Sequence, residues 1–341
     1  MISMETRKIM ALGKSSLVVS LPKDWIKMNN LRRGDTLTLE AHSDLSLVVH
    51  PKLKSDDRRR EIEIKVDPDD GDGAITRMLI GSYLNGYNVI KVTSTKIFPV
   101  EQQRAIRGVV KSLYLRIIES QAGQVVLQTL LDESMASIFL ALERMHTITS
   151  SMCRDVYRAM VEWDVDLARS VISLEEDVDQ FMYFLFRLIR SAAINPSLAN
   201  RLGVDMLDCL DYQTLVSLVE RVADRVNDIA VSIVSLQENE VKVPKEVSDV
   251  LNEMAKAAFD NYDRAMDIFR SGSVEESETV MDQLEEIKRL TRMITPMPIG
   301  SDQNRDAMVP LYVIRDNLRR VGEYTADIAE LTIDKAYKPS S

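Results

Sequence analysis

Cysteine and histidine are scarce in this sequence, which has 2 Cys and 3 His among 341 residues. Cys153 and Cys209 are too few for a disulfide framework or a thiolate metal site, so we expect both in the core. Glu143-x-x-His146 matches half of a di-iron motif, but a second Glu-x-x-His is missing. No Ser/His/Asp or Cys/His set is apparent either. These absences predict that the protein is not an enzyme.

Long hydrophobic runs are also missing. No stretch of 18 or more apolar residues occurs, so we expect no membrane insertion. The first residues, MISMETRKIM, lack the apolar segment of a signal peptide, and we expect a cytoplasmic protein. The stretch GKSS at 13–16 is not a phosphate loop, because Lys8 stands where that motif requires glycine.

Charge is unevenly distributed along the chain. The formal net charge is −10, yet residues 1–54 carry nine Lys and Arg against five Asp and Glu, a net +4. The remaining residues therefore carry −14. Such a split suggests a polyanionic partner at one end of the chain and cations at the other.

Residues 7–51 have the pattern of a small β-rich unit. SSLVVSLP, DTLTLEA and LSLVVHP predict strands, and PKDWIKMNN predicts a short helix with Pro22 at its first position. LRRGD is a turn in which Gly34 supplies the permissive backbone. A unit this small buries little surface alone, so we expect it to dimerise and to bury Leu17, Val19 and Leu37 in the dimer.

The order of strand, short helix, L-x-x-GD turn and strand resembles the AbrB/SpoVT swapped-hairpin DNA-binding domain. The resemblance covers about 45 residues of KIMALGKSSLVVSLPKDWIKMNNLRRGDTLTLE and its continuation. It implies a domain at 1–54 in which two chains interlace their hairpins and present basic loops to DNA. It also implies the DNA-contact candidates, which are Arg7, Lys8, Lys14, Lys23, Arg32 and Arg33.

Residues 55–131 alternate strand and helix. REIEIKV and YNVIKVTS predict strands, DGAITRMLIGSYLNG and VEQQRAIRGVVKSLY predict helices, and LRIIES with QVVLQTLL predicts a hairpin. The β-α-β-α-β-β order indicates a small α/β domain without a phosphate loop or dinucleotide fingerprint. We expect this domain to act as a spacer or to shape a dimer.

From Asp132 onward the pattern is helical. Breaks predict six amphipathic helices at about 132–162, 165–193, 205–239, 245–271, 273–295 and 303–336. LVERVADRVNDIA is repeated about 100 residues later as NLRRVGEYTADIAE. The prediction is therefore a mainly α fold, with two three-helix repeats at 132–241 and 242–341 following the β-rich and α/β domains.

Carboxylates recur at four-residue spacing on these predicted helices, which places them on one helix face. The candidates are Glu175, Asp179, Glu220, Asp224, Asp228, Glu278, Asp282, Glu286, Asp316, Glu323 and Asp327. On the third helix they point away from the apolar stripe and would form a surface patch. One interpretation is a solvated face stabilised by pairs from Arg221 to Asp224 and from Arg225 to Asp228. The other is a site for hard cations such as Mg²⁺, Mn²⁺, Ca²⁺ or iron.

The paired segments ERVADRVNDIA and RRVGEYTADIAE, with VISLEEDVDQF upstream, resemble the PhoU phosphate-uptake regulators over roughly 132–336. The resemblance implies two three-helix bundles that carry a multinuclear metal, with iron, zinc, manganese or magnesium as candidates. Arg319 and Arg320 depart from the family pattern. The second cluster is then smaller or empty, or the guanidinium groups receive an anion such as phosphate.

Together these features predict a homodimeric, DNA-binding regulator of phosphate uptake and homeostasis whose metal-binding helical region senses or docks. The alternative is an adaptor that binds a phosphate ABC transporter or its signalling partner, with the β-rich domain serving only to dimerise. DNA binding distinguishes the two.

Overall fold

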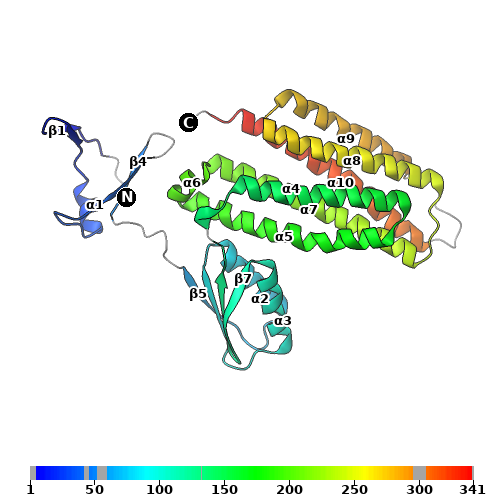
Figure 1. Cartoon of the computed structure of the whole chain (residues 1–341), viewed down its shortest axis with the longest axis horizontal. Helices are drawn as coiled ribbons and strands as arrows, with labels where there is room; N and C mark the ends of the chain where they lie inside the picture. Colours follow the sequence, from blue (N-terminus) through cyan, green and yellow to red (C-terminus); the bar gives the residue numbers. More distant parts are fainter. Residues whose placement is uncertain (1–4, 42–45, 52–59, 132, 295–304, 340–341) are drawn as a thin grey trace. The chain divides into compact units, whose positions relative to one another are not determined.

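The computed structural model describes residues 5–41, 46–51, 60–131, 133–294 and 305–339 (Figure 1). The chain divides into two compact units, residues 1–58 with Ser341, and residues 59–340. The structure thus gathers the three predicted C-terminal domains into one unit. Each unit is described by itself.

The N-terminal unit consists of two short antiparallel hairpins and one helix. Its elements are β1 (Met10–Leu12), β2 (Ser16–Val18), α1 (Lys23–Met28), β3 (Thr38–Ala41) and β4 (Leu47–His50). Gly13 and Gly34 have φ values of 72° and 97°, which side chains disfavour and turns require. The predicted strands and helix occur in the predicted order, but β1 precedes them and was not predicted. Pro22 caps α1 and does not lie within it.

Apolar side chains of this unit are exposed in the single chain. None of the residues described in 5–51 is buried, and Leu17 and Val19 are 74% and 53% exposed. Leu37 is half-buried. Apolar side chains on short strands need a partner surface to leave water, so burial of these residues in a dimer stays a prediction.

The α/β part of the second unit has the predicted element order. Its elements are β5 (Glu61–Lys65), α2 (Asp72–Leu84), β6 (Val89–Thr93), α3 (Val100–Ser112), β7 (Leu115–Gln121) and β8 (Gln124–Thr129). The sheet order is β5-β6-β8-β7, with β5 and β6 parallel and the other pairs antiparallel. Alternating strand residues such as Ile64, Ile90 and Leu127 form its core with Ile75 and Leu79 of α2.

Seven helices and one 3₁₀ turn are described after this sheet. They are η1 (Glu133–Met135), α4 (Ile138–Glu162), α5 (Val165–Ile194), α6 (Pro196–Leu202), α7 (Met206–Glu238), α8 (Lys245–Ser271), α9 (Val274–Ile294) and α10 (Arg305–Ala336). The six predicted long helices are confirmed, and their starts follow capping residues such as Ser137, Asp164 and Asp205. The first helix starts six residues later than predicted because η1 precedes it. The predicted break at INPSLANRLG contains α6, with Pro196 in its first turn.

The long helices lie roughly side by side in a bundle (Figure 1). Helices α4, α5 and α7 pack together, as do α8, α9 and α10, and α7 also packs against α10. A single continuous core includes residues of both groups. The fold is thus mainly helical, with two three-helix repeats that share one core. No helix in the described part of the chain is long and apolar enough to span a membrane.

Candidate functional site

Five predicted carboxylates meet where α5 packs against α7. Their four-residue spacing keeps Glu175 and Asp179 on one face of α5, and Glu220, Asp224 and Asp228 on one face of α7. All five side chains are half-buried, so the predicted surface patch on α7 is only partly open to solvent. The packing of α5 covers part of the α7 face. We call these residues the α5–α7 acidic cluster.

The cluster is electrostatically strained. Burial, and then the charges of Asp224 and Asp179, raise the pKa of Glu220 to about 7, while Arg221 and Arg225 oppose the shift. Burial, Glu175 and Asp224 raise the pKa of Asp179 to about 6. The coupling between Asp179 on α5 and the carboxylates of α7 shows that the two helices bring their acidic faces together.

Two arginines of α7 partly neutralise this charge. Arg225 lies 2.9 Å from Asp228 and 3.7 Å from Asp224, which confirms the predicted pair from Arg225 to Asp228. Arg221, predicted to pair with Asp224, lies over the Tyr324 ring of α10 at 5.8 Å. Because two arginines cannot neutralise five carboxylates, the cluster keeps an excess of negative charge.

The donor chemistry of the α5–α7 acidic cluster suits a hard cation, because carboxylate oxygens are the ligands such ions prefer. Its arrangement is less favourable. Within the described ranges, no three His, Cys, Asp or Glu side chains are grouped so that they could hold a metal ion as they stand. Metal binding at these residues therefore stays a prediction.

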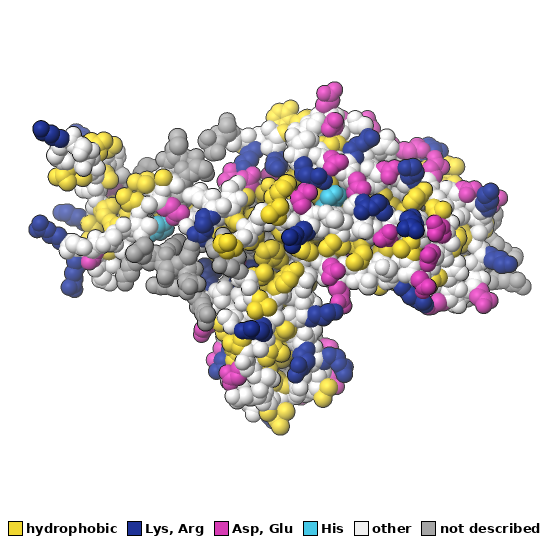
Figure 2. Space-filling model, in the orientation of Figure 1, with side chains coloured by type: hydrophobic (Ala, Val, Ile, Leu, Met, Phe, Trp, Pro, Cys, Tyr) yellow, Lys and Arg dark blue, Asp and Glu magenta, His cyan; other side chains and the backbone are white. Residues whose placement is uncertain are grey.

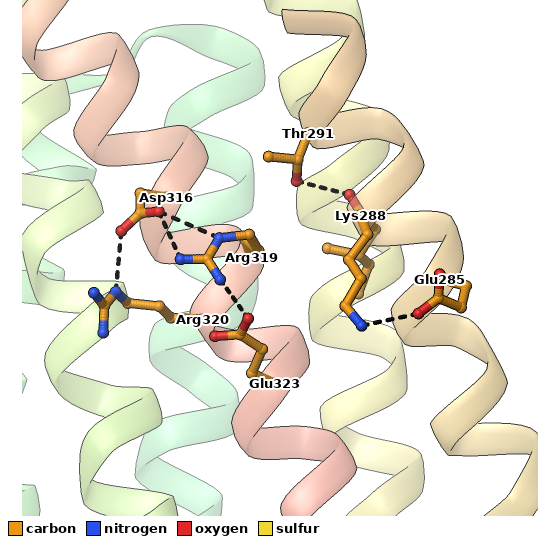
Figure 3. A network of polar contacts seen from close by, with 8 residues as sticks. Glu285, Lys288, Thr291, Asp316, Arg319, Arg320 and Glu323 are labelled. Atoms are coloured by element: carbon orange, nitrogen blue, oxygen red, sulfur yellow. Dashed lines mark hydrogen bonds and ion pairs between the residues drawn. The ribbon is translucent and has the colours of Figure 1, made fainter. Parts of the chain in front are cut away.

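In the second predicted set, on α9 and α10, the α10 carboxylates Asp316 and Glu323 pair with arginines of the same helix (Figure 3). Arg319 donates to Asp316 at 2.8 Å and pairs with Glu323, while Arg320 donates to Asp316 at 3.0 Å. Burial acts to raise the pKa of Asp316, but hydrogen bonds from both guanidinium groups lower it below the ordinary value. The two arginines therefore neutralise Asp316 and Glu323, two of the predicted metal ligands.

The α9 carboxylates face solvent or pair locally. Glu278 and Asp282 are exposed, and Glu286 lies 2.6 Å from Arg289. Asp327 on α10 has a pKa raised by burial and then by Glu330 and Glu323. This second set therefore differs from the α5–α7 acidic cluster, where carboxylates face one another across two helices.

The six predicted DNA-contact residues all lie in the N-terminal unit and are all exposed. Arg7 pairs with Glu5, and the backbone N–H of Arg32 donates to the Asp35 carboxylate at 2.6 Å, which stabilises the L-x-x-GD turn. Figure 2 shows Lys and Arg side chains projecting from this unit. Exposed cationic side chains of this kind can contact phosphates.

The residues of the half di-iron motif have structural contacts. His146 is buried, and its Nδ1 lies 3.3 Å from the Tyr262 hydroxyl. Glu143 lies 3.2 Å from Arg270 of α8. The contacts of His146 and Glu143 join α4 to α8 and explain the motif as helix packing.

Cys153 and Cys209 are both buried, as predicted.

Sequence reasoning missed Arg187 of α5, which is fully buried. Its Nη1 donates to the carbonyls of Tyr83 at 2.6 Å and Tyr87 at 2.9 Å, and its Nε lies 2.6 Å from Glu133. The guanidinium also lies 4.9 Å from the centre of the Tyr83 ring. The charge of Arg187 within the apolar run FMYFLFRLI was the available signal, since an arginine on an apolar helix face needs buried partners.

Fold and site define a class of protein built from two three-helix repeats with acidic helix faces. A family model described as PhoU domain matches residues 142–233 and 251–332, just over half of the chain. This chain therefore belongs to the PhoU family. A second model, described as antidote-toxin recognition MazE, bacterial antitoxin, matches residues 10–57 and confirms an AbrB-like N-terminal domain.

Individual relatives are distant. The phosphate-specific transport system accessory protein PhoU homolog of Rhizobium meliloti (strain 1021) is 23% identical over 205 residues, covering 58% of this chain and 84% of that protein. The crystal structure of the phosphate transport system regulatory protein PhoU from Streptococcus pneumoniae is 16% identical, with a TM-score of 0.47, and covers 57% of this chain and 91% of that one. The crystal structure of PhoU from Pseudomonas aeruginosa is 18% identical, with a TM-score of 0.47, and covers 57% of this chain and 93% of that one.

The raised pKa of Glu220 predicts a stability gain from neutralising it. A carboxyl whose pKa is higher in the folded state binds more protons when folded, so its charge destabilises the fold as pH rises from about 4 to 7. In metal-free protein at pH 8, Glu220→Gln should therefore increase the free energy of unfolding by about 1 kcal/mol, since partial exposure of the side chain weakens the electrostatic penalty. The melting temperature should rise by a few degrees. At pH 5 the parent and variant should melt together.

Thermal unfolding of both proteins, followed by circular dichroism at pH 5–8, measures the difference between their melting temperatures. Other titrating groups, such as buried His146, contribute equally to both proteins, so their effects cancel in this difference. Glu278→Gln, on the exposed face of α9, is the matched control and should leave the melting temperature unchanged at either pH. A Glu220→Gln effect that is equal at pH 5 and pH 8 would contradict electrostatic strain in the cluster.

Proposed function

We propose that this protein is a DNA-binding regulator of phosphate uptake that acts as a homodimer rather than as an enzyme. The observation that carries the proposal is the joining, in one chain, of two PhoU-domain matches with a MazE-like unit that exposes six basic side chains. The name of the Rhizobium meliloti relative supplies the link to phosphate-specific transport. The basic unit contacts DNA, and the helical region carries the regulatory signal.

Dimerisation is part of this proposal. Ile9, Leu12, Leu17 and Leu39 are all at least 60% exposed in a unit that buries no side chain of its own in the described residues. Pairing two such units would remove these surfaces from water and double the basic charge offered to DNA.

An adaptor that binds a phosphate transporter or its signalling partner is the second candidate. The favouring observation is that the chain covers 84% of a relative named as a transport-system accessory protein. In this alternative the N-terminal unit dimerises without contacting DNA.

Chromatin immunoprecipitation of the full chain from phosphate-replete and phosphate-starved cells tests the regulator. Fragments next to phosphate-uptake genes should be enriched, and enrichment should be lost in the Arg7→Ala/Arg33→Ala variant. An enrichment profile equal to that of an untagged strain would favour the adaptor. In that case, purification from membranes should recover transporter subunits.

Metal binding by the helical region is the remaining part of the proposal. Glu175, Asp179, Glu220, Asp224 and Asp228 would hold the ion, because cation binding would relieve their mutual repulsion. The bound metal would supply a charge that ties α5 to α7. Zinc, iron, manganese and magnesium are the candidates.

Purified full-length protein should take up more than one divalent or ferric ion per chain, as measured by elemental analysis after titration and desalting. Changing Glu220, Asp224 and Asp228 together to Ala should lower that number. Changing Glu278, Asp282 and Glu286 together to Ala is the matched control and should reduce it less. Absence of metal from the parent protein after titration would leave the cluster as a strained acidic face.

A further inference from the structure

Strand β5 lies at one edge of the α/β sheet, and within the part of the chain that the structure describes it has a neighbouring strand on one side only (Figure 1). Towards β6, the carbonyl of Arg60 accepts from Val89 at 3.2 Å, and the N–H of Val66 donates to Thr93 at 2.9 Å. A parallel ladder uses the backbone groups of alternate residues. The N–H and C=O groups of Glu61, Glu63 and Lys65 therefore point outward from the sheet edge.

An open groove of about 930 Å³ follows this edge, lined by all of β5 and by Met78, Gly81, Ser82, Asn85 and Tyr87. The groove is open at Gly81, where an added Cβ would meet no atom within 4 Å. The groove thus combines the outward-pointing N–H and C=O groups of β5 with open space beside α2. A strand added beside β5 would fit both features.

The opposite edge of the sheet is different. Strand β7 pairs with β8 through a register shift between Ile117 and Glu119, and such bulges interrupt further pairing at an edge. Strand β5 pairs with β6 over five consecutive residues without a shift. It is therefore the edge that can accept another strand.

We propose that β5 pairs antiparallel with β5 of a second copy of this chain, joining the two sheets into one. The sequence of β5 is self-complementary when the two-fold axis passes through Glu63. Glu61 then lies opposite Lys65 of the second copy, and Ile62 lies opposite its Ile64. The two-fold symmetry forms each of these pairs twice. Opposite charges in such cross-strand positions stabilise pairing.

Both faces of the paired strands are consistent with this register. Ile62 and Ile64 pack into the core on the α2 side, whereas Glu61, Glu63 and Lys65 are exposed on the other side. Glu63 meets its own copy at the axis, where one like-charge contact opposes two attractive ones. A shift of two residues either way would instead place Glu61 opposite Glu63 or opposite Asp67, which doubles the like-charge contacts.

The connection to the N-terminal unit favours a second copy over another partner, and this step rests on the proposed dimer. Ten residues separate His50, the end of β4, from Glu61. They can span no more than about 40 Å, because an extended residue covers about 3.3–3.6 Å. Once the N-terminal units pair, the two β5 strands are held at an effective concentration on the order of millimolar.

Cysteine cross-linking of the full-length protein tests this pairing. Glu63→Cys lies at the axis and should form a disulfide-linked dimer rapidly under mild oxidation at micromolar concentration. Glu61→Cys should not, because its own copy lies about four residues away along the strand. Arg116→Cys, on the opposite edge strand β7, is a further control expected to remain monomeric on denaturing gels. Native Cys153 and Cys209 are buried and remain in every variant.

Charge exchange tests the register. In the Glu63→Cys background, Lys65→Glu should slow cross-linking several-fold, and Glu61→Lys/Lys65→Glu should restore it. Light scattering of each variant gives the oligomeric state separately. A dimer in which Glu63→Cys cross-links no faster than Arg116→Cys would overturn the β5 pairing alone. A monomeric full-length protein would overturn the proposed N-terminal dimer as well.

Discussion

Binding of the full-length protein to duplex DNA is expected to weaken steeply as salt is added. If each chain neutralises three or four phosphates, a dimer neutralises about six to eight, and log affinity should fall against log salt with a slope of roughly −5 to −7. The acidic remainder of the chain, at −14, does not prevent this. Screening over about 8 Å at physiological salt allows an exposed basic surface to act locally.

Single substitutions in the basic unit should reduce that slope. Arg7→Ala or Arg33→Ala removes one phosphate contact per chain, so the slope of the dimer should fall by about two. Fluorescence anisotropy with labelled DNA at 50–300 mM salt measures it. Lys256→Ala, which removes an exposed lysine of α8 paired with Asp260, is the matched control and should leave the slope unchanged. A slope near zero for the parent protein would support the adaptor.

Replacing Arg187 should cause the largest loss of stability among the substitutions considered. Arg187→Ala removes the guanidinium donor of the Tyr83 and Tyr87 carbonyls, of which Tyr83 keeps the Gly86 N–H at 3.0 Å. It also leaves Glu133 without its cation. Breaking a buried ion pair from one side costs about 3–5 kcal/mol. Because these groups join α5 to the α/β region, urea unfolding should shift to a much lower midpoint, or the α/β region should unfold separately.

Two variants separate the buried charge from packing. Arg190→Ala removes an exposed arginine three residues along α5 that donates to Asn85 at 2.8 Å, and it should cost under about 1 kcal/mol. Arg187→Met/Glu133→Gln removes both charges and should recover part of the loss seen in Arg187→Ala. Equal midpoints for Arg187→Ala and Arg190→Ala would show that the buried contacts contribute little.

The sequence by itself determined the order of the α/β elements and of the six long helices, and it determined the repeat. Helix lengths follow from apolar periodicity and capping residues, which act within a few residues of chain, so the long helices of 165–194 and 206–238 were predictable. The β-α-β-α-β-β pattern was readable for the same local reason. The spacing of Glu220, Asp224 and Asp228 likewise fixed which side chains share a helix face.

Only the tertiary structure decided what those faces meet. Packing of α5 against α7 made Glu220 half-buried and raised its pKa, partly through the charge of Asp179 on the other helix. The buried partners of Arg187 lie about 100 residues earlier in the chain. Burial and Coulomb energy depend on distances between segments far apart in sequence, which no local pattern specifies.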